Sequence, residues 1–109
     1  MGYIRHHAIV VTSYQEIDIN SALNKAISLG MRATGVVGPT NNDTWSFLVA
    51  PDGSKEGWAD SNKGDGQRES FKAWLRTSEL KGPFHAHWVE VQYGDDNGIT
   101  AIVDHSDDT

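Results

Sequence analysis

The 109-residue chain contains no cysteine. Disulfides, thiolate zinc sites and cysteine nucleophiles are therefore excluded, and any metal site would need histidine and carboxylate ligands. The chain also lacks an apolar run near the roughly 20 residues that cross a bilayer, and its start does not show the pattern of a signal peptide. We expect one cytoplasmic domain spanning residues 1–109, with no membrane partner.

Basic residues are few as well: nine Lys and Arg stand against fifteen Asp and Glu, which gives a net charge of −6. A nucleic-acid partner is not expected, because phosphate contacts need a basic footprint. The basic and acidic residues are unevenly distributed along the chain. Most of the bases lie between Lys55 and Lys81, whereas the segment from Pro83 onward carries acids and no base, and ends in a predicted acidic tail from about residue 104.

Hydrophobic periodicity and turn residues predict an α+β fold. The predicted strands cover 3–13, 32–37, 44–50, a short stretch near 54–58, 84–93 and 99–105, and the predicted helices run from Asp18 or Asn20 to Gly30 and over 67–77, after a long loop at 59–66. This pattern indicates an antiparallel sheet of five to six strands with two helices on one face, in the order β-α-β-β-(β)-α-β-β, similar in outline to the ferredoxin-like group.

The face of the sheet that is not packed against the helices is expected to carry apolar and aromatic side chains. Trp45, Phe47 and Val49 share one face of their strand by alternation, and alternate residues of the 85–93 strand form another such set. A partner subunit would cover such a face, so we expect a homo-oligomer.

Histidine is the most distinctive residue type, because four of the five lie in two strand-like tracts: His6, His7, His85 and His87. Alternate residues of a strand share a face, so His85 and His87 could bind one divalent metal if His6 or His7 supplied a third ligand. Structural or surface roles are the alternative for all four.

The tract Arg5 to Ser13, a helix ending at Gly30, and the segment Trp45 to Ser54 together resemble one βαβββ module of the vicinal-oxygen-chelate group, which includes glyoxalases. The resemblance covers residues 5–58, about half of the chain. It implies a metal-dependent enzyme with His6 or His7 and Glu56 as ligands.

A second candidate site is the glycine-rich segment before the second helix. Helix N-termini attract phosphate and carboxylate groups, and a basic stripe continues along the helix. In this hypothesis Trp58 stacks on a flat ligand, and the cations neutralise its phosphate; they are Lys63, Arg68, Lys72 and Arg76. A solvated helix face is the alternative interpretation.

The chain as a whole looks like the small acidic proteins that phages and prophages encode, in segments such as Ala50 to Trp58 and Trp88 to Asp96. That resemblance implies a counter-defence role in the host cytoplasm. We therefore expect a non-catalytic module that sequesters a small anionic, nucleotide-like signal without a cofactor. The alternatives are an acidic inhibitor or nucleic-acid mimic that acts on a host protein through Glu90, Asp95, Asp96 and Asp104, and the metal enzyme above.

Overall fold

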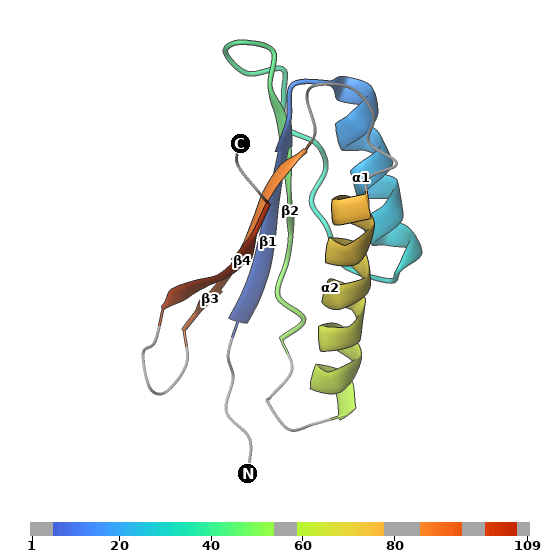
Figure 1. Cartoon of the computed structure of the whole chain (residues 1–109), viewed down its shortest axis with the longest axis vertical. Helices are drawn as coiled ribbons and strands as arrows, with labels where there is room; N and C mark the ends of the chain where they lie inside the picture. The colour runs from blue at the N-terminus through green and yellow to red at the C-terminus, as the bar shows by residue number, and fades with distance from the viewer. Residues whose placement is uncertain (1–5, 54–58, 78–85, 95–99, 107–109) are drawn as a thin grey trace.

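The computed structural model describes residues 6–53, 59–77, 86–94 and 100–106. Its elements follow the order β-α-β-α-β-β: β1 (His6–Ser13), α1 (Glu16–Ser28), β2 (Trp45–Val49), α2 (Ala59–Thr77), β3 (His87–Tyr93) and β4 (Ala101–His105). The strands form one antiparallel sheet in the spatial order β2-β1-β3-β4. Both helices lie on the same face of this sheet, which leaves the other face without a helical layer (Figure 1).

The α+β class, the antiparallel sheet and the two helices on one face are confirmed, but the predicted number of strands is wrong. The segment 32–37 runs beside β2 and pairs with it only at isolated bridges, at Ala33 and Val37, with a further backbone hydrogen bond from Thr34 N–H to the Leu48 carbonyl, so no continuous ladder forms there. The predicted strand near 54–58 lies outside the described residues. In the described residues the element after β2 is α2, so the element order also differs from the β-α-β-β-α-β order of the ferredoxin-like group.

The strand register separates the two faces of the sheet. Val10 lies between Leu48 and Val89, and these side chains belong to the face without helices, which we call the open face. Ile9 and Val11 alternate with Val10 and point toward the helices, because successive side chains of a strand point to opposite faces. The prediction of which side chains lie on the open face is therefore right for the 87–93 strand. It is wrong for β2, whose Trp45, Phe47 and Val49 face the helices.

The core lies between the sheet and the helices. Ile9 and Val11 of β1 contribute to it, as do Phe47 of β2 and Trp88 of β3, all at most 4% exposed. The helices add the fully buried Ile19, Ala22 and Ala26 of α1 and Phe71 of α2, with Leu75 nearly buried. Ile27 of α1, in contrast, is 58% exposed although it follows the same apolar spacing along the helix.

Helix α1 begins at Glu16, before the predicted caps Asp18 and Asn20, and ends as the sequence predicts. Gly30 follows the helix with φ of +83°, a conformation that residues with a Cβ rarely adopt. Its neighbour Met31 donates a backbone hydrogen bond to the carbonyl of Ala26 at 3.1 Å, which closes a Schellman-type end.

Helix α2 begins at Ala59, so the predicted loop at 59–66 is wrong for these residues. Glycine and small polar residues normally favour turns, yet Gly64 lies buried inside the helix. The reason is packing, since a Cβ on Gly64 would overlap the Asp52 carboxylate. Arg68, one helical turn after Gly64, donates a hydrogen bond from Nη1 to Oδ2 of Asp52 at 3.3 Å. Gly64 thus lets the chain after β2 approach α2 closely.

The two α2 glycines give opposite predictions. Gly64→Ala is expected to lower the free energy of unfolding by about 1–2 kcal/mol, because Asp52 must shift. Gly66→Ala should raise it by roughly 0.5–1 kcal/mol, because a Cβ there meets no atom and alanine favours helix. Urea unfolding of both variants measures the difference. Equal effects of the two substitutions would contradict the close approach at Gly64.

Asp104, near the predicted start of the acidic tail, belongs to β4 and lies opposite Glu90 of β3. Residues 107–109 lie outside the described residues. Within the described ranges, neither helix has the length and apolar character required to cross a membrane.

Candidate functional site

The strands that carry the two histidine tracts pair with each other, but His6 and His87, the described histidines that share the open face, lie at opposite ends of the pair. β1 and β3 are antiparallel, so His6 lies opposite Tyr93, whereas His87 lies opposite Thr12. Thr12 is six positions after His6 along β1, which corresponds to a distance of roughly 20 Å at 3.3 Å per residue. His6 and His87 therefore cannot bind the same metal ion.

His7 is also separated from His87, because it points to the helical side of the sheet. There its Nδ1 lies 3.1 Å from Oε2 of Glu90. The other two ligands considered for a metal, His85 and Glu56, lie outside the described residues. Among the residues that the structure does describe, no three His, Cys, Asp or Glu side chains come together as a metal site.

The basic stripe of α2 points toward the sheet. Arg68 and Lys72 are only 7% and 5% exposed, and they share the inner helix face with Phe71 and Leu75. A buried cation is stable only when carboxylates neutralise it. Both have such partners: Arg68 contacts Asp52, Asp65 and Glu90, and Lys72 contacts Glu69, Glu90 and Asp104.

Glu90 is the centre of this ionic cluster and is only 4% exposed. Its Oε1 accepts a hydrogen bond from Lys72 Nζ at 2.6 Å, and its Oε2 lies 3.7 Å from Arg68 Nε as well as near His7. Burial alone would raise the pKa of Glu90, but the hydrogen bonds from His7 and Lys72 outweigh it and lower that pKa. Glu90 is therefore held as the anion that joins β1, β3 and α2.

Asp104 extends the cluster to the edge strand. Its Oδ1 accepts a hydrogen bond from Arg76 at 2.6 Å, and its Oδ2 lies 3.1 Å from Lys72 Nζ. The bond from Arg76, more than the one from Lys72, lowers the pKa of Asp104 to about 2. Burial disfavours the charged form of Lys72, but hydrogen bonds to Glu69, Glu90 and Asp104 raise its pKa above the ordinary range.

Because of these contacts, most cations of the predicted anion site are already paired and are not available to bind a ligand. Arg68 and Lys72 already bind carboxylates, and Arg76 bonds Asp104 while its guanidinium lies 5.0 Å from the centre of the Trp88 ring. Lys63 is exposed on α2, and Trp58 lies outside the described residues. A crevice beside Arg68 encloses about 90 Å³, too little for a nucleotide.

The same contacts bear on the acidic inhibitor considered from the sequence. Two of its four acids, Glu90 and Asp104, face α2 and are neutralised there. Asp95 and Asp96 lie outside the described residues.

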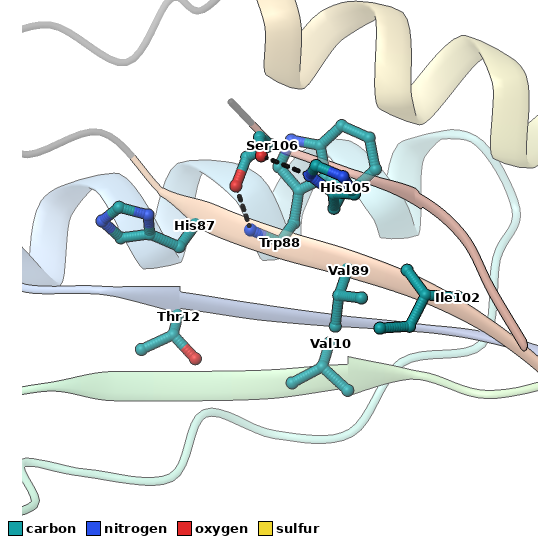
Figure 2. Close-up of a pocket in the computed structure, with 8 residues that line it drawn as sticks. All are labelled: Val10, Thr12, His87, Trp88, Val89, Ile102, His105 and Ser106. Atoms are coloured by element: carbon teal, nitrogen blue, oxygen red, sulfur yellow. Dashed lines mark hydrogen bonds between the residues drawn. The ribbon is translucent and has the colours of Figure 1, made fainter. Parts of the chain in front are cut away.

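A larger hollow lies on the open face, where it occupies about 420 Å³ over β1, β3 and β4. Val10, Val89 and Ile102 lie together at its floor, while Thr12 and His87 lie farther along the same strands (Figure 2). His105 and Ser106 complete the lining from the end of β4. The hollow thus combines an apolar floor with hydroxyl and imidazole groups at one end.

Two hydrogen bonds fix the polar end of the hollow. Ser106 Oγ accepts a bond from the Trp88 backbone N–H at 3.1 Å, and His105 Nδ1 lies 2.7 Å from the Ser106 carbonyl oxygen (Figure 2). A carbonyl accepts only from a protonated nitrogen, so Nδ1 carries the hydrogen and Nε2 is the second functional atom of the ring. His87 packs edge-on against Tyr14, with ring centres 6.4 Å apart.

The sequence prediction included His87 but missed His105 and the hollow. The missed signal was register: β4 pairs with β3, and His105 then lies opposite Val89, two residues from His87. Comparison with family models, with curated proteins and with solved structures finds no match to this chain.

Proposed function

We propose that this chain is a non-catalytic binding protein that takes up a small anionic, nucleotide-like molecule on the open face of its sheet. The observation that carries this proposal is the hollow of about 420 Å³, whose volume lies in the usual range of small-molecule sites. Binding without turnover sequesters the ligand, which agrees with the role expected from the sequence.

The lining of the hollow supports this class of ligand. Val10, Val89 and Ile102 offer an apolar floor on which a planar base can lie. Thr12 and Ser106 provide hydroxyl groups, and an imidazole donates through both nitrogens when it is protonated. A phosphate group near His87 and His105 would therefore meet several hydrogen-bond donors.

The charge distribution also favours the open face over the helical face. The strand register places no carboxylate on the open face among the described residues. On the helical side, by contrast, Lys72 already binds Glu90 and Asp104 and is not available to an added phosphate.

Calorimetry with adenosine 5′-monophosphate, cyclic nucleotides and unphosphorylated adenosine tests the proposal. We expect binding of at least one phosphorylated probe, and a loss of about tenfold or more in His105→Ala and in His87→Ala, because a hydrogen bond to a charged group contributes about 1.5–3 kcal/mol. Lys63→Ala, an exposed position on α2, is the matched control and should leave the affinity unchanged.

Two results would contradict the proposal. One is the absence of heat with every phosphorylated probe. The other is a loss of affinity in Lys63→Ala that equals the loss in His105→Ala, which would return the site to the start of α2.

A further inference from the structure

The open face differs from the rest of the molecule in its charge. The chain has nine Lys and Arg and fifteen Asp and Glu. None of them falls at a described open-face position of the four strands, which are His6, Ala8, Val10, Thr12, Ser46, Leu48, His87, Val89, Val91, Tyr93, Ile102 and His105. A surface meant only to meet water would normally carry its share of charge.

The open face also exposes large apolar side chains. Val10 is 39% exposed, Tyr93 38% and Ile102 66%, and the half-buried Leu48 and Val89 lie on either side of Val10 on the same face. In Figure 1 no element of the described chain covers this side of the sheet. Contiguous apolar surface of this kind typically marks a site of association.

We propose that a second copy of this chain covers the open face with its own open face, in a two-fold symmetric dimer. The charge pattern selects this occupant. Each copy carries a net charge of −6, so contact through its charged surfaces would bring like charges together, whereas contact through an uncharged face does not. The open face supplies that surface, and a face that meets itself forms the closed contact typical of dimers.

The geometry of the sheet sets the strength of this contact. Sheets commonly pack face to face at about 10 Å, and four strands at about 4.8 Å spacing, with about six residues each at 3.3 Å, cover roughly 400 Å². A standard interface buries about 800 Å² per partner, so we infer a reversible dimer with a dissociation constant in the micromolar range rather than an obligate one.

The dimer bears on the proposed binding site as well, and this step rests on the proposed function. The hollow on one copy is open toward the side that the second copy covers, so each hollow would be covered by the partner's sheet. A ligand held there would be enclosed by both sheets.

Sedimentation velocity without any ligand tests the dimer, over protein concentrations from about 5 to about 500 µM that span a micromolar dissociation constant. The wild-type mass should rise from that of one chain to that of two. Tyr93→Lys and Ile102→Lys place a charge on each copy's open face and should keep the protein monomeric. Ile17→Lys is the matched control, because Ile17 is a 71% exposed apolar residue on α1, and it should still dimerise.

Circular dichroism is used to check that each variant is folded. One folded open-face variant is enough for the comparison with the wild type. A wild-type chain that stays monomeric at the highest concentration would overturn the inference, as would an Ile17→Lys variant that also loses the dimer. The two proposals fail separately: a monomer that still binds a nucleotide leaves the function in place, whereas a dimer that binds none leaves the association in place.

Discussion

Replacing Glu90 with glutamine is expected to lower the free energy of unfolding by about 3–5 kcal/mol, the cost of breaking a buried ion pair by removing one partner. The reason is that Lys72 and Arg68 remain buried, and the shared carboxylate between them is lost. Glutamine keeps the size of the side chain, so the loss reflects charge rather than volume. Urea unfolding followed by tryptophan fluorescence measures it.

Glu69→Gln is the control for this prediction. Glu69 contacts the same Lys72 Nζ at 2.6 Å, but its side chain is 70% exposed, and exposed ion pairs contribute about 0–1 kcal/mol. A Glu90→Gln variant that is no less stable than Glu69→Gln would contradict the account of how α2 is held on the sheet.

Acid is expected to remove the same stabilisation without a mutation. The folded-state pKa of Glu90 is lowered, and that of Asp104 is lowered to about 2. A carboxyl group whose pKa is lower in the folded state contributes stability above its unfolded pKa, which is about 3.9 for Asp and 4.3 for Glu. This contribution is therefore complete above about pH 5 and is lost as the pH falls toward 2.

The measurement is the urea midpoint at a series of pH values from about 6 down to about 2.5, within the window where these carboxylates titrate. We expect a steady fall in the wild type and a shallower fall in Glu90→Gln, which has one carboxylate fewer to protonate. A midpoint that stays constant across the series would show that neither carboxylate is stabilised by the fold.

Much of the fold could be predicted from periodicity, because β1, α1 and the hairpin of β3 and β4 follow strong local patterns. The start of α2 could not, since the residues 59–66 favour turns and the close approach of Asp52 to Gly64 depends on tertiary packing. The segment 32–37 has strand-like composition, but its pairing with β2 is interrupted, which depends on tertiary contacts.

The site was harder to predict than the fold, because charge looks the same in a sequence whether it is solvated or buried. Arg68, Phe71, Lys72 and Leu75 follow the spacing of a single helix face, and Glu90 lies inside an apolar strand. Together these two patterns indicate cations buried against a carboxylate. The basic stripe was interpreted as a phosphate site because its partners come from distant segments of the chain.

The position of the binding surface is tested most directly by methyl NMR during a titration with adenosine 5′-monophosphate. The account predicts shifts for the methyl groups of Val10, Val89 and Ile102, and none for Met31 and Val49 beside Arg68. Shifts confined to Met31 and Val49, with the open-face methyls unchanged, would contradict it and place the anion at α2.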